Sequence, residues 1–201
     1  MMNFTRILLA VFCLQTTTSF SQEETDYTQQ PALSIHFLLH DFQTAANIRN
    51  SSLSSTLAKK QFGKIKDMSP GLAISYSEGL SNNFDVSVTL AGSFLDYPMQ
   101  NETSSGNDKF LLEVDASIRG KMFSDKYWFT PYLLAGVGAS KYTGYYGAFI
   151  PLGAGLQINF FDEAFLLINT QYRVPITETV NYHFYHSIGL AGNIGRKKSK
   201  G

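Results

Sequence analysis

Apolar and polar side chains alternate along most of the chain after residue 30. The clearest run is Leu112–Met122, "LEVDASIRGKM", in which every second residue is apolar or lacks a side chain. A period of two is typical of a β-strand with one apolar and one polar face. The same pattern predicts strands at Ala32–Asp41, Gly71–Glu78, Phe84–Asp96, Phe110–Met122, Phe129–Ser140, Ala148–Asn159, Ala164–Val174 and Phe184–Ile194.

The connections between these segments alternate in length. Three are short polar turns, "GLSNN", "FSDKYW" and "FFDE". The others are longer, at Phe42–Pro70, Tyr97–Lys109, Tyr142–Gly147 and Pro175–His183. Short turns at one end and longer loops at the other are typical of an outer-membrane barrel, with the turns in the periplasm and the loops outside. Within the first long loop, Ser54–Phe62 is predicted to form a short amphipathic helical turn across the rim.

Many side chains on the polar face of the strands are small, and others are charged. Small side chains suit the interior of a narrow barrel. Strands of about ten residues are long enough to cross the apolar band of an outer membrane, roughly 25 Å. We therefore expect the apolar face to meet lipid and the charged side chains to pair inside the lumen. These charged residues are Asp85, Glu113, Asp115, Arg119, Lys121 and Arg173.

The alternative is a secreted soluble barrel of lipocalin type, with apolar side chains inside and polar ones outside. Such a barrel needs charges along the outer face of every strand. Here that face would instead present bare backbone at Gly136, Gly138, Gly153 and Gly155. Aromatic residues also gather near the strand ends, as in the girdles at a membrane interface. Alternation alone does not separate the two, but these features favour the membrane barrel.

The N-terminus has the layout of a secretory signal peptide. One basic residue, Arg6, precedes the apolar block Ile7–Leu14, and cleavage is expected after Ser21. The block is too short to span a bilayer as a helix. We divide the chain into a signal peptide (1–21), a loose polar lead (22–30), the barrel (31–195) and a basic periplasmic tail (196–201). The one cysteine, Cys13, lies in the signal, so disulfides are excluded from the mature chain.

Charge is balanced over the whole chain, with 16 basic and 16 acidic residues. This balance gives no reason to expect a nucleic-acid partner. The first long loop is the exception, since its basic residues face only Asp67. A basic outer loop can contact the phosphates of lipopolysaccharide, or its charges can simply keep it solvated. The basic residues are Arg49, Lys59, Lys60, Lys64 and Lys66.

Four segments near the C-terminus resemble a known group. "PYLLAGVGASKY" and "PLGAGLQINF" look like glycine-rich barrel strands, and "AFLLINTQYRVP" and "YHSIGLAGNIG" look like the last two strands. The chain thus resembles the eight-stranded OmpA-like outer-membrane barrels, a superfamily that includes OmpX-like and OmpW-like proteins. The resemblance implies assembly by periplasmic chaperones and the barrel assembly machinery, and it covers the barrel only. We therefore expect no peptidoglycan-binding domain. The terminal aromatic residue that members usually carry is also replaced here, by Ile194 and the basic tail.

The histidines are the candidate catalytic or metal-binding residues. "HFYHS" places His186 and Ser187 on opposite faces of one strand. His183 and Ser187 share a face, but they lie too far apart to form a dyad. We therefore assign no catalytic residue and no cofactor. His40 and His183 are expected to be neighbours near the loop end, where a metal pair or a pH-sensitive latch is conceivable. Two imidazoles lack a third assured ligand, so ordinary hydrogen bonding is favoured and no metal site is assigned.

The sequence therefore predicts an all-β, eight-stranded antiparallel up-and-down transmembrane barrel in the outer membrane. We expect a monomer with a structural or surface-interaction role, whose partners are the lipid bilayer and lipopolysaccharide. Eight strands enclose only enough room for side chains, so we expect a plugged lumen rather than a pore. The alternatives are a barrel enzyme that modifies lipid A or lipopolysaccharide, and the soluble lipocalin-like carrier.

Overall fold

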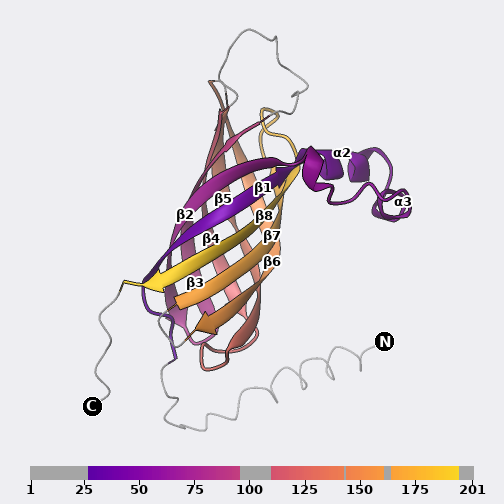
Figure 1. Ribbon diagram of the computed structural model, residues 1–201. Coiled ribbons are helices and arrows are strands. Elements are labelled where there is room, and N and C mark those ends of the chain that lie inside the picture. Colours follow the sequence, from indigo (N-terminus) through magenta and orange to yellow (C-terminus); the bar gives the residue numbers. More distant parts are fainter. Residues whose placement is uncertain (1–26, 96–109, 143, 161–163, 195–201) are drawn as a thin grey trace, which may run out of the picture.

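The computed structural model describes residues 27–95, 110–142, 144–160 and 164–194 (Figure 1). Several predicted segments lie outside the described residues. They are the signal peptide, residues 22–26 of the lead, the loop at 97–109, most of the "FFDE" turn and the tail at 196–201. The strands and the first long loop are described.

The described chain forms one closed barrel of eight antiparallel strands (Figure 1). Each strand pairs with its neighbours along the chain, and the first pairs with the last to close the sheet. All eight predicted strands are present, which confirms the up-and-down barrel. The strands are β1 (Ala32–Asp41), β2 (Ser69–Ser81), β3 (Phe84–Phe94), β4 (Phe110–Lys121), β5 (Phe129–Tyr142), β6 (Tyr145–Phe160), β7 (Ala164–Pro175) and β8 (His183–Asn193).

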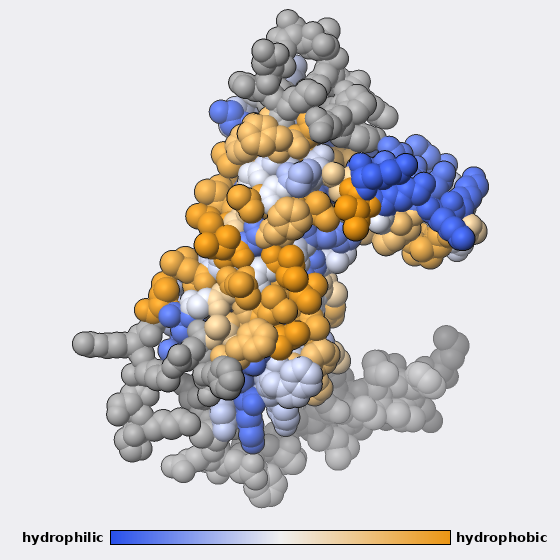
Figure 2. Space-filling view, in the orientation of Figure 1, coloured by the Kyte–Doolittle hydropathy of each residue, from blue (hydrophilic) through white to orange (hydrophobic). Residues whose placement is uncertain are grey.

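Side chains alternate between the lumen and the exterior in the sense that the sequence predicts. In β4, Glu113 and Asp115 are 1% and 2% exposed, whereas Val114 and Ile118 are 45% and 54% exposed. Figure 2 shows the result, an apolar band over the outer surface of the strands. A soluble lipocalin-like carrier would have the opposite arrangement, so the structure contradicts that alternative.

Inward glycines let large side chains lie flat across the lumen. The Tyr132 ring on β5 covers Gly155 on β6, where an added Cβ would lie 2.4 Å from the ring. The Phe149 ring covers Gly138 in the same way, with a Cβ 2.4 Å from the ring. Any side chain at these glycines would displace an aromatic ring, so the glycines set how tightly the interior packs.

Two connections differ from the predictions. Residues 142–147 were expected to form a loop, but β5 and β6 extend to Tyr142 and Tyr145 and leave only two residues between them. Gly144 adopts φ +92°, a conformation that favours glycine, and this permits the tight connection. The first long loop also contains an unpredicted helix, α2 (Phe42–Asn50), followed by α3 (Leu53–Ala58) and a 3₁₀ turn, η1 (Ile65–Asp67).

The barrel has a turn end, where β2–β3, β4–β5 and β6–β7 are connected, and a loop end, where α2 and α3 project (Figure 1). We had expected a loose lead, but the end of the lead packs against the barrel at the turn end. Gln29 is 4% exposed, and its Nε2 donates to Ser77 Oγ at 3.0 Å. Among the described residues, no helix has the length and apolar character needed to cross a membrane.

Candidate functional sites: the charged lumen and the basic arm

Arg173 is the centre of an ion-pair group near the loop end of the lumen. It enters from β7 and is 0% exposed. Its Nη1 donates to Glu113 Oε2, and its Nη2 donates to Asp115 Oδ2 at 3.1 Å, both on β4. One guanidinium thus links two acids across the barrel, which gives both carboxylates a charge-assisted hydrogen bond.

Aromatic rings hold the Arg173 guanidinium in place. Its Cζ lies 4.0 Å from the centre of the Tyr185 ring and 4.8 Å from the centre of the Phe149 ring. A planar cation between two ring faces gains cation–π attraction and loses its freedom to rotate. The group therefore places a cation, two anions and two rings together inside the barrel.

A second ion-pair group lies near the turn end. Lys121 Nζ lies 2.9 Å from Asp85 Oδ1 and 2.9 Å from Asp125 Oδ2. Asp125 comes from the β4–β5 turn and was not among the expected lumen charges, since nothing in the turn's composition shows that it folds inward. Its Oδ1 also accepts from Gln157 Nε2 at 2.9 Å. Burial raises the pKa of Asp125, and the neighbouring Lys121 ammonium acts in the opposite direction.

Arg119 was expected to pair with an inward acid, but in the described chain it belongs to neither ion-pair group. Its guanidinium faces the Tyr132 ring, 5.7 Å from the ring centre. It borders a polar cavity of about 30 Å³ in the middle of the barrel, lined largely by serines and by His36. A cavity of this size holds one or two water molecules.

His40, Glu113 and His183 meet near the Arg173 group. Glu113 Oε2 lies 3.5 Å from His40 Nε2, and Glu113 Oε1 lies 3.4 Å from His183 Nε2. In the described chain, this is the one group of three side chains whose atoms could together hold a metal ion. The sequence suggested the two histidines as neighbours but not the acid between them, because β4 is not adjacent to β1 or β8.

The serine and the two histidines of "HFYHS" do not form a dyad. His183 and Ser187 face the lumen, while His186 faces outward and lies 3.1 Å from Thr170 Oγ1. A different pair, Ser34 and His36, is within 2.8 Å in the central cavity. Ser75 Oγ also lies 3.2 Å from the same His36 nitrogen, so the imidazole belongs to an ordinary polar network in the lumen.

Residues 42–68 form a folded projection at the loop end, which we call the arm. Asp41 Oδ1 caps α2 by accepting from the Thr44 amide at 2.8 Å, and Ser52 Oγ caps α3 by accepting from the Ser55 amide at 3.1 Å. The turn after α3 is bound back to α2, since the Gly63 amide donates to Thr44 Oγ1 at 3.0 Å. The helical turn expected at Ser54–Phe62 therefore corresponds to α3, and α2 precedes it.

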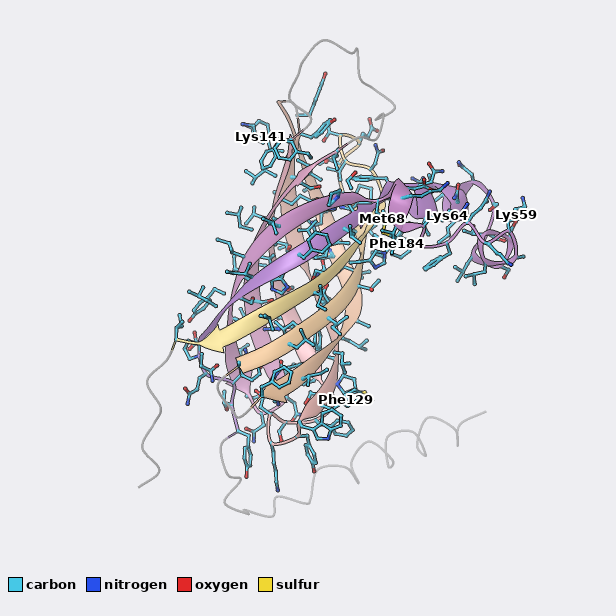
Figure 3. The ribbon with its side chains drawn as sticks, viewed as in Figure 1. Lys59, Lys64, Met68, Phe129, Lys141 and Phe184 are labelled. Carbon is cyan, nitrogen blue, oxygen red and sulfur yellow. The ribbon has the colours of Figure 1, made fainter. Side chains whose placement is uncertain are left out.

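Two ring contacts attach the arm to the barrel, one at Tyr182 just before β8 and one on β8 itself. The Arg49 guanidinium lies 3.9 Å from the centre of the Tyr182 ring, and the Phe62 ring centre lies 5.9 Å from that of Phe184 on the outer face of the barrel. In Figure 3, Met68 and Phe184 lie where the arm meets the barrel, and Lys59 and Lys64 lie farther out. These contacts extend the apolar exterior of β8 onto the arm.

The arm has two chemically different sides. Figure 2 shows hydrophilic atoms along its upper side in this view and hydrophobic atoms beneath. The exposed apolar side chains are Leu53, Leu57, Phe62 and Ile65, from 40% to 73% exposed. Its five basic residues are all exposed, and within the described chain none forms an ion pair. The structure thus brings Arg49, Lys59, Lys60, Lys64 and Lys66 together on one small element.

No protein-family model matches this chain, and no curated protein matches it either. Solved structures do match. They include the outer membrane protein OprG of Pseudomonas aeruginosa, with a TM-score of 0.55, 10% identity and coverage of 82% of this chain and 96% of that one. The N-terminal β-barrel domain of OprF from the same organism has a TM-score of 0.52, 10% identity and coverage of 82% and 98%. Neisserial surface protein A has a TM-score of 0.51, 11% identity and coverage of 81% and 96%.

Identities this low show a shared fold and nothing finer. The chain therefore has the fold of the eight-stranded outer-membrane barrels, as the resemblance in its glycine-rich strands predicts.

Proposed function

We propose that this protein is an outer-membrane barrel with a closed lumen whose arm binds phosphate-bearing lipid of the outer leaflet. The observation that carries the proposal is the arm itself. Its exposed apolar side chains continue the apolar exterior of the barrel, and its basic residues have no acidic partners among the described residues. The role is structural and interactive rather than enzymatic.

Insertion into the outer membrane follows from the outer surface of the barrel. Large apolar side chains are exposed on every strand, from Ile35 on β1 to Leu190 on β8. In water such a band would drive aggregation, whereas in a bilayer it replaces lipid–lipid contacts at little cost. Export through a signal peptide cleaved after Ser21 would place the turn end in the periplasm and the arm outside.

The localisation can be tested directly. The mature protein is expected in the outer-membrane fraction, to begin at Gln22, and to migrate faster on gels when unboiled than when boiled. A soluble periplasmic protein, or one that retains residues 1–21, would contradict this part of the proposal.

Closure of the lumen is supported by its two ion-pair groups and by the lead. Arg173 with its acids fills the loop half, and Lys121 with Asp85 and Asp125 fills the turn half. An ion crossing this interior would have to separate buried charge pairs, which costs several kcal/mol. We expect no conductance above background when the purified protein is added to planar bilayers. Steady channels of porin size would refute a closed lumen.

The arm resembles an interfacial element in its chemistry. A short amphipathic segment with basic residues binds a membrane surface by burying its apolar side at the headgroup boundary and placing its cations near lipid phosphates. Each basic residue near an anionic surface contributes about 1 kcal/mol. If two or three of the five engage phosphate at once, the affinity for lipopolysaccharide rises by about 30- to 160-fold.

A charge-neutralised arm tests the lipid partner. The variant changes Arg49, Lys59, Lys60, Lys64 and Lys66 to Gln, and a matched control changes the exposed Lys126 and Lys141, outside the arm, to Gln. With protein folded in zwitterionic micelles, the arm variant is expected to bind lipopolysaccharide at least tenfold more weakly than wild type, and the control unchanged. Equal binding by all three proteins would show that the arm is only a solvated loop.

The enzymatic alternative has less support in the lumen. Ser34 and His36 are close, but His36 Nδ1 has no hydrogen-bond partner in the described chain, so no third group orients the imidazole as a catalytic base. The cavity beside them, about 30 Å³, holds water and not an acyl chain. Expression of the protein is expected to leave the mass of lipid A unchanged.

A further inference from the structure

Three buried side chains converge at the point where the barrel closes. His40 is on β1 and His183 on β8, the two strands that pair to close the sheet, and Glu113 reaches them from β4. Each is 1% exposed, and their candidate ligand atoms all lie within 4.8 Å of one another. The group therefore joins two walls of the barrel.

One spacing within the group matches that around a small tetrahedral cation. A Zn²⁺ ion binds nitrogen and oxygen at about 2.0–2.2 Å, which places neighbouring ligand atoms about 3.4 Å apart. Glu113 Oε1 lies 3.4 Å from His183 Nε2, and the other carboxylate oxygen, Oε2, lies 3.5 Å from His40 Nε2. The spacing between Glu113 Oε1 and His183 Nε2 is thus already that of a bound ion, and the His40 ring needs to move toward these two atoms.

In this group, the lone pair of His183 Nε2 faces a carboxylate oxygen with no donor between them. His183 Nδ1 lies 2.9 Å from the Asn181 carbonyl oxygen, which can only accept, so this nitrogen carries the proton. In the neutral ring, Nε2 then presents a lone pair toward Glu113. His40 Nε2, His183 Nε2 and Glu113 Oε1 have no hydrogen-bond partner among the described residues. Buried acceptors that face one another are unfavourable unless a cation lies between them.

The surrounding charge favours a cation. With neutral imidazoles, the carboxylates of Glu113 and Asp115 face one guanidinium, that of Arg173, and leave one negative charge in excess. Arg173 occupies Glu113 Oε2 and leaves Oε1 available. It also orients the carboxylate, as hydrogen-bonded neighbours commonly do for metal ligands.

Aromatic packing holds both imidazoles in position. Phe42 stacks on His183 with ring centres 4.5 Å apart, and Tyr185 contacts His40 edge-on at 5.5 Å. A cavity of about 10 Å³ adjoins Glu113 and His183 and is bordered by Tyr145 and Thr179, which are exposed at the loop end. It has room for about one water molecule.

We propose that His40, Glu113 and His183 bind one divalent transition-metal ion of the Zn²⁺ type, with a water molecule in the adjoining cavity as fourth ligand. Two imidazoles and one carboxylate suit such an ion, whereas Mg²⁺ and Ca²⁺ prefer oxygen ligands alone. The bound ion would tie the closing strands β1 and β8 to β4. This inference is independent of lipid binding by the arm.

The test is a Zn²⁺ titration of untagged, metal-free protein folded in detergent, read out by competition with a chromophoric chelator. Wild type is expected to bind one equivalent, and His40→Gln and His183→Gln are each expected to lower the affinity about 100-fold or more. The matched control is His36→Gln, on the same strand and the same inward face as His40 but bonded to Ser34 and Ser75. It should bind as wild type does.

Gel mobility before and after boiling checks that each variant folds. A second measurement needs no variant: Zn²⁺ should shift the imidazole nitrogen resonances of His40 and His183 in wild type and leave those of His36 unchanged. The inference is overturned if wild type binds no Zn²⁺, if the folded His40 and His183 variants bind as wild type does, or if the two imidazole signals do not move.

Discussion

Arg173 in the lumen and Arg49 on the arm make the same contact in two different environments. Arg173 Cζ lies 4.0 Å from the centre of the Tyr185 ring, and Arg49 Cζ lies 3.9 Å from that of Tyr182. Arg173 is 0% exposed and bonded to two carboxylates, whereas Arg49 is exposed and has no acidic partner among the described residues. The two contacts have the same geometry. Their surroundings differ, because Arg173 is buried beside two carboxylates and Arg49 is exposed to water without an acidic partner among the described residues.

This difference separates charge that stabilises the fold from charge that remains available for binding. In the lumen, a buried ion that loses its partner has no water to solvate it, so removing one member of an ion pair is costly. On the arm, water solvates each cation, and a ring contact adds only a little stability. The lumen charges are therefore part of the fold, and the arm charges can interact with a partner.

The largest expected effect comes from Arg173→Met. It leaves Glu113 and Asp115 buried without their guanidinium and should lower the free energy of unfolding by about 3–5 kcal/mol. Its matched control, Arg49→Met, removes an exposed cation–π contact and should cost about 0.5–1 kcal/mol. Urea unfolding in lipid vesicles, followed by Trp128 fluorescence, measures both. Similar losses in the two variants would abolish the distinction between lumen and arm.

A lysine on the outer face tests which solvent meets the barrel. Val114 is 45% exposed on β4, and Val114→Lys should lower the free energy of unfolding by about 2–4 kcal/mol if lipid surrounds it. Ile176→Lys, in the loop between β7 and β8, should cost about 0–1 kcal/mol because it lies beyond the apolar band. The same vesicle assay applies, and a neutral Val114→Lys would mean that this face meets water.

The smallest expected effect concerns the order of the arm. Ser52→Ala removes the N-cap of α3 and should destabilise that helix by about 1 kcal/mol. The amides of Thr56 and Lys59, which donate to the Ser52 and Ser55 carbonyls, should then exchange with solvent several-fold faster. Amides of the barrel strands serve as the internal control. Faster exchange in β8 as well would show that the arm and barrel unfold together.

The arm shows where sequence reasoning was incomplete. A short amphipathic turn was predicted within residues 54–62, but α2 was taken for a loop, since its nine residues carry only a weak apolar pattern. The available signal was Asp41, an N-cap residue at the end of a strand. The five basic residues could be read from the sequence, but their common exposure beside an apolar underside could not.

The sequence by itself determined the barrel, because a period of two over eight segments leaves one apolar and one polar face to every strand. It also determined which charges on the strands point inward, from Asp85 to Arg173, but not Asp125 in a turn. Only the tertiary structure decided which of them meet. β4 and β7 are not neighbours in the sheet, so the contact of Arg173 with Glu113 depends on the closure and register of the whole barrel. The same closure brings His40 and His183 to Glu113, and no local pattern encodes contacts across a lumen.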